Sequence, residues 1–299
     1  MNLKQKFYLL VHPNNNIEDD KYLIDYIISD KVFKIFTILW ILHIVFLYNQ
    51  RLSFSEKDIF IPLLDFQKIF LPTYPSFLYF YSITIIGITS AIWSIQKSTI
   101  LPRIILLFCV LWLNAFKWSF GSISHSGHLL ILTHFFSLFL VFKSNYNIRS
   151  FVCQIKYFQF GILLTYTIAG LWKLLFLIKD SFFPKQQYTT WLDPEAVKTN
   201  AITNLLDKDY IANGWMEKMY NIPIIWQIAV LSVFFIQLIS IIGVINKKCS
   251  YFITLGLISF HLYNQYFTLT YFYPTIFTLL IIFFPYHLFI KNDFIKNFK

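Results

Sequence analysis

The stretch LTYTIAGLWKLLFLI (residues 164–178) places a lysine inside a predicted membrane-spanning helix. Apart from Lys173, every residue in this stretch is uncharged, and most of them are apolar. An ammonium group at membrane depth costs roughly 2.5–3.5 kcal/mol on insertion scales. A chain that keeps a lysine there must compensate for it with other groups, and ionisable residues inside a membrane commonly mark functional sites.

The composition of the whole chain also indicates a membrane protein. Of its 299 residues, 57% are hydrophobic and only 13% are charged, about half the charged fraction of a soluble domain. The net charge of +10 does not indicate a nucleic-acid-binding protein, because the basic residues are scattered between apolar segments. Three cysteines without a C-x-x-C motif predict neither a disulfide framework nor a metal knuckle.

Eight apolar segments approach the roughly 20 residues that a helix needs to cross a bilayer. They cover residues 32–48, 77–95, 99–116, 125–142, 151–178, 223–245, 250–267 and 271–288. The last two segments run together, so seven spans are an alternative. We therefore predict an all-α, polytopic helical membrane protein with about eight transmembrane helices.

The charges in the termini, in the loops and at the ends of the spans predict the orientation. More of the Lys and Arg residues, Lys34 and Arg103 among them, fall in segments on the side that holds both termini. Because such residues favour the cytoplasm, both termini are predicted to be cytoplasmic. The predicted organisation is a cytoplasmic N-terminal segment (1–31), one transmembrane domain (32–288) and a cytoplasmic tail (289–299). Within the domain, residues 179–222 form a long extracytoplasmic loop.

Polar residues of three spans fall at a similar depth. Counted from the flanking basic residues at about 1.5 Å per residue, Lys173 lies about 25 Å, Asn264 about 24 Å and His261 about 20 Å above the cytoplasmic side. In the fourth segment, His128 lies about 22 Å and His125 about 27 Å above it. These residues thus share one predicted layer in the outer third of the hydrocarbon core.

Each of these residues also has a purely structural explanation. Lys173 could extend to the outer interface, since the span ends shortly after it. His125 and His128 could form hydrogen bonds with neighbouring groups at the start of a helix. His261 and Asn264 lie one turn apart on a helix face and could bond across helices. The agreement of three spans in depth favours a site.

The chemistry open to such a layer is limited. The spans contain no carboxylate pair, and the chain has no H-E-x-x-H, G-x-S-x-G or phosphate-loop motif. The histidine spacing matches no known metal signature, so no metal is predicted. Two histidines near the midplane, His43 and His134, are interpreted as structural contacts. A buried amine such as Lys173 can serve as a general base, with His261 or Asn264 stabilising an oxyanion on a lipid-soluble substrate.

Three stretches, YTIAGLWKL, FHLYNQYFTLTYFYPTIFTLL and SHSGHLL, resemble motifs of the vitamin K-dependent gamma-carboxylases. The first resembles the family's Y-F-I-A-G-x-x-K-L, and Lys173 falls on its catalytic lysine. The second resembles F-H-x-x-N-x-x-L-F, with His261 and Asn264 at its His and Asn. The third sits where the carboxylases have a histidine that helps engage the quinone, and both His125 and His128 fit.

The stretch W-x-D-P-E-A at 191–196 also resembles the loop that follows the lysine in the wider group, the HTTM (horizontally transferred transmembrane) domain. The resemblance spans roughly residues 31–288. It implies a reduced, vitamin K-like quinone as cofactor and a site that opens on the outer face. In the implied reaction the lysine deprotonates the quinone, which reacts with oxygen and becomes a strong base. That base removes a proton from a glutamyl side chain, and carbon dioxide adds.

Two departures from the carboxylases widen the choice of function. This chain ends eleven residues after its last predicted span, where the carboxylases continue into a large β-rich region, and GSISHSGH replaces their W-N-N-H. The first hypothesis is an enzyme of the lyase class that uses Lys173 on a quinone or other lipid-soluble substrate. The second is a non-catalytic partner in maturation or export of a secreted peptide, similar to sporulation-delaying-protein systems. A transporter is the third. All three belong in a bacterial inner or plasma membrane.

Overall fold

In the parts of the chain that it describes, the structure, a computed structural model, consists of helices joined by short non-helical connections. The described parts are residues 16–53, 60–120, 126–140, 147–182, 193–206 and 214–290. Within them, four helices are long and apolar enough to cross a membrane, and they cover Asp19–Gln50, Phe77–Gln96, Ile100–Trp118 and Ile148–Phe182. A fifth span results if Gly214–Tyr220 and Pro223–Leu238, which meet at 80°, cross together. The chain is therefore an all-α membrane protein, as predicted, whereas eight spans and cytoplasmic termini stay predictions.

The chain divides into two compact units. Among the described residues, the N-terminal unit contains those between 16 and 158 and between 277 and 290, and the C-terminal unit contains those between 159 and 276. The boundary falls inside helix α7 (Ile148–Phe182). The predicted transmembrane domain, residues 32–288, thus comprises parts of both units.

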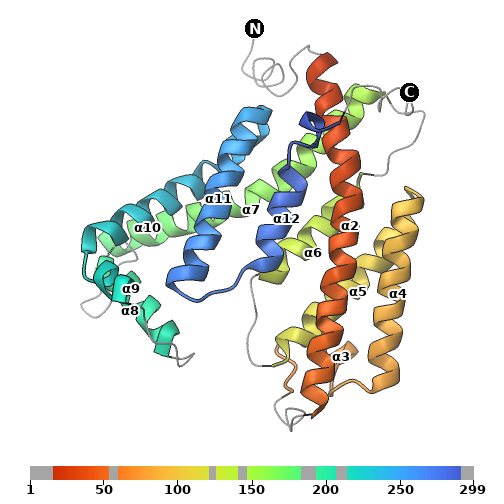
Figure 1. Cartoon of the computed structure of the whole chain (residues 1–299), viewed down its shortest axis with the longest axis horizontal. Coiled ribbons are helices and arrows are strands. Elements are labelled where there is room, and N and C mark those ends of the chain that lie inside the picture. The colour runs from red at the N-terminus through yellow and green to blue at the C-terminus, as the bar shows by residue number, and fades with distance from the viewer. Residues whose placement is uncertain are drawn as a thin grey trace. The chain divides into compact units, whose positions relative to one another are not determined.

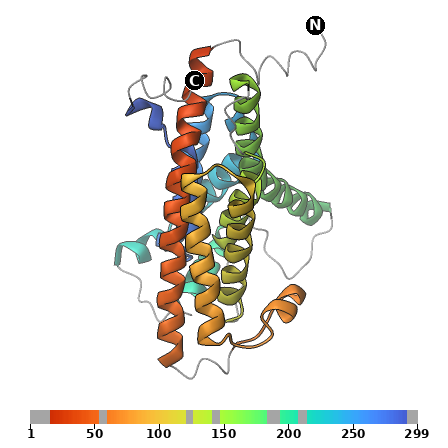
Figure 2. The ribbon, with the colours of Figure 1, turned by 90° about the vertical axis from the view of Figure 1, so that its right-hand side faces the viewer.

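Helices α2 (Asn16–Ser53), α4 (Phe77–Gln96) and α5 (Ile100–Trp118) pack together in the N-terminal unit. In both views α4 runs alongside α2 (Figures 1 and 2). Gly87 lies where α4 touches its two neighbours, since a Cβ there would lie 3.1 Å from Ile41 Cδ1 and 3.2 Å from Cys109 Cβ. The short helices of this unit are α3 (Asp65–Phe70), α6 (Ser126–Ser137) and η3 (Tyr286–Leu288).

Buried charges tie three helices of the N-terminal unit together. Arg103 of α5 donates from Nη2 to Asp30 Oδ2 of α2 (2.9 Å) and from Nη1 to the carbonyl oxygen of Ser137 at the end of α6 (2.8 Å). Lys34, one turn beyond Asp30, also bonds to that carboxylate. Lys34 and Arg103, which count among the predicted cytoplasmic charges, lie within helices, and each is only 2% exposed. Their charges are neutralised inside the unit rather than by water.

The C-terminal unit contains the second part of α7, then α8 (Pro194–Leu206), α9 (Gly214–Tyr220), α10 (Pro223–Leu238), η2 (Ser240–Val244) and α11 (Lys247–Phe267). Helix α10 begins with Pro223, whose missing N–H is no loss in a first turn. The Asn246 side chain caps α11 by accepting a hydrogen bond from the Cys249 amide at 2.9 Å. Helix α12 (Tyr273–Phe283) crosses the unit boundary.

The loop predicted at 179–222 contains α8 and α9, which lie beside the N-terminal end of α10 and the C-terminal end of α11 (Figure 1). Trp226 is the centre of the small core that holds them, with its ring stacked on Tyr220 at 5.2 Å. The Tyr220 hydroxyl donates to the carbonyl oxygen of Phe267 at 2.9 Å. The buried members of this core are Ala201, Leu205, Met216, Tyr220, Trp226 and Leu269.

Candidate functional site

One face of α7 in the C-terminal unit carries the conspicuous motif residues. Thr167, Gly170 and Lys173 lie three residues apart, so they project from the same side of the helix. The Thr167 hydroxyl accepts a hydrogen bond from the Ile241 amide at 3.1 Å, just past the end of α10. At Gly170 the two helices meet backbone to backbone, because a Cβ there would lie 2.7 Å from the Leu238 amide nitrogen. This close approach brings Lys173 to the last turn of α10.

The Lys173 ammonium has two neighbours that suit a cation in an apolar setting. Its Nζ donates to Gln237 Oε1 at 2.8 Å and lies 5.8 Å from the centre of the Phe260 ring. Gln237 is itself buried, with 5% of its surface exposed. An amide oxygen and an aromatic face both stabilise an ammonium group. Residues of α10 and α11 thus offset part of the cost of burying Lys173.

Lys173 lies on the wall of a cavity of about 370 Å³. Asn264 lies on the same wall, so the structure brings together these two candidate residues, whose catalytic roles stay predictions. The full lining is Lys173, Ala196, Asn200, Ala229, Val230, Val233, Phe260, Tyr263, Asn264 and Thr268. Ala196 belongs to the W-x-D-P-E-A stretch, of which residues 191 and 192 lie outside the described parts of the chain. We call this space the Lys173 cavity.

His261 follows the lining residue Phe260 in the sequence, but it is buried and does not itself line the cavity. It is 4% exposed, its Nε2 lies 2.9 Å from the Tyr166 hydroxyl, and the rings of Phe260 and Phe272 are each 4.8 Å from its own. Among the parts of the chain that the structure describes, His261 Nδ1 has no hydrogen-bond partner. Tyr166 thus fixes the imidazole, and sequence reasoning missed this residue although it opens the YTIAGLWKL motif.

The remaining predicted site residues lie elsewhere in the chain. His125 lies outside the described residues. His128 belongs to the N-terminal unit, where its ring stands edge-on to Trp118 at 5.2 Å. That either histidine meets Lys173 stays a prediction. His134 has the expected kind of structural contact, with Nε2 3.0 Å from the Thr37 hydroxyl.

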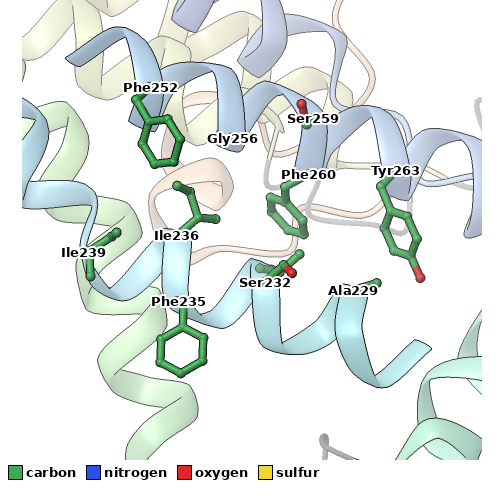
Figure 3. Close-up of a pocket in the computed structure, with 11 residues that line it drawn as sticks. Ala229, Ser232, Phe235, Ile236, Ile239, Phe252, Gly256, Ser259, Phe260 and Tyr263 are labelled. Atoms are coloured by element: carbon green, nitrogen blue, oxygen red, sulfur yellow. The ribbon is translucent and has the colours of Figure 1, made fainter. Parts of the chain in front are cut away.

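A second cavity, of about 460 Å³, runs between α10 and α11 (Figure 3). Its lining is almost wholly apolar and consists of Ala229, Ser232, Val233, Phe235, Ile236, Ile239, Phe252, Gly256, Ser259, Phe260 and Tyr263. Phe235 and Phe252 at its rim are 56% and 68% exposed. We call this space the α10–α11 groove.

Metal chemistry has no evident site in the part of the chain that the structure describes. No group of three or more His, Cys, Asp or Glu side chains there could hold a metal ion. The side chains that line the Lys173 cavity offer an amine, an amide and hydroxyl groups beside an apolar groove. No family model, curated protein or solved structure matches this chain.

Proposed function

We propose that this chain is a membrane enzyme of the HTTM type, in the vitamin K-dependent gamma-carboxylase-like superfamily, and that Lys173 is its general base. The observation that carries the proposal is the position of the Lys173 amine on the wall of a cavity of about 370 Å³ that it shares with Asn264. Small-molecule sites commonly occupy about 300–1,000 Å³ and combine apolar walls with a few polar groups. A lipid-soluble substrate with oxygen atoms on a compact head group suits this lining.

Each polar group near the amine has a role in this proposal. The Gln237 carbonyl oxygen accepts one N–H of Lys173 and leaves the nitrogen lone pair for a substrate hydroxyl. After the proton transfer, the same oxygen and the Phe260 ring stabilise the ammonium. The Asn264 amide donates to the oxygen that becomes negative. A bound reduced quinone would supply the reaction with oxygen, and this reaction would yield a base stronger than the lysine.

We further propose eight spans, cytoplasmic termini and a cavity on the outer side of a bacterial membrane. Support comes from Ala196 and Asn200 of α8, because both line the Lys173 cavity. Helix α8 lies in the segment that the loop charges assign to the outside. A substrate in the outer part of the bilayer could therefore reach the cavity without crossing the membrane.

The cavity favours the enzyme over a non-catalytic partner of a secreted peptide. A polar layer that serves only to hold helices together is expected to be closed and packed, since an open cavity forfeits packing energy. The lining beside Lys173 is open enough to take a ring. The partner hypothesis predicts instead that filling the cavity has no effect on function.

The test is turnover of reduced menaquinone to its epoxide in membranes that contain the protein. Lys173→Met keeps the length and the apolar stem of the side chain but removes the amine. Lys179→Met is the matched control, since Lys179 is an exposed lysine six residues further along the same helix. A general base contributes about 10²- to 10⁴-fold, so Lys173→Met should lower the rate at least a hundredfold.

The control should retain the rate of the unmodified protein. Equal epoxide formation in both variants would refute a base at Lys173. If the unmodified protein forms no epoxide while it is folded and inserted, quinone chemistry fails and the peptide-partner hypothesis takes its place.

A further inference from the structure

Two residues lie where three cavities of the C-terminal unit meet. Ala229 and Tyr263 line the Lys173 cavity and the α10–α11 groove, and also a third cavity of about 310 Å³ beside Trp226. Val233 and Phe260 are shared by the first two cavities. The Lys173 cavity and the groove therefore share four lining residues, two from α10 (Ala229 and Val233) and two from α11 (Phe260 and Tyr263).

The groove itself follows the helix periodicity. From α11 it takes residues 252, 256, 259, 260 and 263, which recur every three to four positions on one face. Gly256 brings the helices together at its floor, because a Cβ there would lie 2.7 Å from Ile236 Cδ1. The only polar atoms that its side chains contribute are the hydroxyls of Ser232, Ser259 and Tyr263. A hydrocarbon chain suits such a lining.

The hydroxyl of Tyr263 is a buried polar group beside the cavities. Figure 3 shows Tyr263 and Phe260 pointing from α11 toward α10, where Ala229 stands. Among the residues that the structure describes, no group accepts from or donates to this hydroxyl, which is fully shielded from solvent. A buried hydroxyl without a partner costs free energy, which a ligand oxygen would recover.

We propose that Ala229 and Tyr263 determine which substrate the Lys173 cavity accepts. The small side chain of Ala229 leaves a passage from the Lys173 cavity into the α10–α11 groove, through which the hydrocarbon chain of the substrate runs. The Tyr263 hydroxyl donates a hydrogen bond to an oxygen of the head group, which lies against Lys173 and Asn264. The substrate is thus an amphiphile with an oxygen-bearing ring and one long chain. This inference rests on the proposed function and adds the residues that select the substrate.

The experiment compares two probes that differ only in the chain. Menadione has the naphthoquinone ring alone, and menaquinone with four isoprenoid units has a closely similar ring with a chain. Binding to the whole protein in lipid nanodiscs is followed by quenching of tryptophan fluorescence, with each probe expressed as a mole fraction of lipid. Trp226 is a useful reporter because its ring centre is 6.1 Å from that of Tyr263.

The two substitutions should act differently on the two probes. Ala229→Phe fills the passage, so it should weaken binding of the chain-bearing quinone at least tenfold and that of menadione less than twofold. Tyr263→Phe removes one neutral hydrogen bond, so it should weaken both probes equally, by about three- to tenfold. Leu231→Phe is the control, since Leu231 is 40% exposed on the same helix and lines none of the three cavities. It should change neither affinity.

Several results would overturn the inference. One is an equal effect of Ala229→Phe on both probes, or on neither. Another needs no variant: equal affinity of the unmodified protein for the two probes would mean that the groove does not hold the chain. Lys173→Met separates this failure from that of the proposed function. If Ala229→Phe weakens neither probe while Lys173→Met still lowers epoxide formation, only the passage is wrong; if Lys173→Met leaves epoxide formation unchanged, the proposed function itself fails.

Discussion

Replacing Gly170 by alanine should force α7 away from the end of α10. The new methyl group would lie 2.7 Å from the amide nitrogen and 2.8 Å from Cα of Leu238, and 3.1 Å from the carbonyl carbon of Gln237. These are backbone atoms, which cannot rotate aside as the end of a side chain can. Restoring an ordinary contact of 3.4 Å requires the helices to separate by about 0.7 Å, the difference between 3.4 and 2.7 Å.

Two opposing terms decide the change in the free energy of unfolding. Overpacking of this kind costs about 1–3 kcal/mol, whereas alanine in place of glycine inside a helix gains about 1 kcal/mol. The net destabilisation is therefore about 0–2 kcal/mol. The site should suffer more, because the same displacement would lengthen the bond between Lys173 Nζ and Gln237 Oε1 from 2.8 Å to about 3.5 Å. At that distance the amide no longer orients the amine.

Gly256→Ala, on α11, is the matched control for stability. Its methyl group would also meet atoms at 2.7 Å, but these are Cδ1 and Cγ1 of the Ile236 side chain, which can change rotamer for about 0.5–1.5 kcal/mol. The gain in helix propensity offsets that cost, so the thermal midpoint should stay close to that of the unmodified protein.

Thermal unfolding in nanodiscs and epoxide formation are then measured on both variants. Each 1 kcal/mol corresponds to about 2–4 °C in a domain of 150–250 residues. Gly170→Ala should lose most of the turnover even where its midpoint falls by only a few degrees. Full turnover in Gly170→Ala, with a midpoint equal to that of Gly256→Ala, would refute the close approach of α7 and α10 and the role of Gln237.

Three further predictions concern stability and orientation. Asp30→Asn leaves two buried cations of the N-terminal unit without their shared carboxylate, so it should lower the free energy of unfolding by about 3–5 kcal/mol. The loss should appear in gel filtration as disappearance of the folded peak. Asp65→Asn, at an exposed ion pair, is the control and should change nothing measurable. Tyr166→Phe removes the hydrogen bond to His261 and should lower the thermal midpoint by the equivalent of about 1 kcal/mol; an unchanged midpoint would contradict that contact. Thr199→Cys, in a background without the native cysteines, should react with a membrane-impermeant maleimide added to intact cells, and reaction only after lysis would reverse the proposed orientation.

Helices whose ends are marked by polar residues between two apolar runs could be predicted from the sequence. The segments expected at 77–95 and 99–116 correspond to Phe77–Gln96 and Ile100–Trp118, because polar residues separate two apolar runs of the right length. The span expected at 223–245 ends as an α-helix at Leu238 and continues as a 3₁₀ turn. Apolar content could not reveal this break, at which the Thr167 hydroxyl of α7 accepts a hydrogen bond from the Ile241 amide.

The two candidate residues that line one cavity, Lys173 and Asn264, could be selected from the sequence because each is a polar residue that interrupts an apolar run. Gln237 gives the same signal, since it lies in the apolar stretch FFIQLI. It lies outside the three stretches that resemble carboxylase motifs, so there was no reason in the sequence to pair it with Lys173. Tyr166 and Tyr263 could not be singled out, because the chain contains 19 tyrosines and composition gives no reason to choose among them. Only the packing of α7, α10 and α11 distinguishes these two hydroxyls from the rest.

The buried cations of the two units differ in what happens if they lose a proton. Lys34 shares the Asp30 carboxylate with Arg103, so a neutral Lys34 would remove attraction from an anion that is itself poorly exposed to water. Lys173 donates to a neutral amide, and a neutral amine keeps that hydrogen bond without leaving an uncompensated charge on Gln237. Lys173 also faces a cavity from which a proton could come, whereas Lys34 is enclosed by its ion pair. Proton transfer is therefore compatible with the surroundings of Lys173, and the Asp30 cluster is suited to holding helices together.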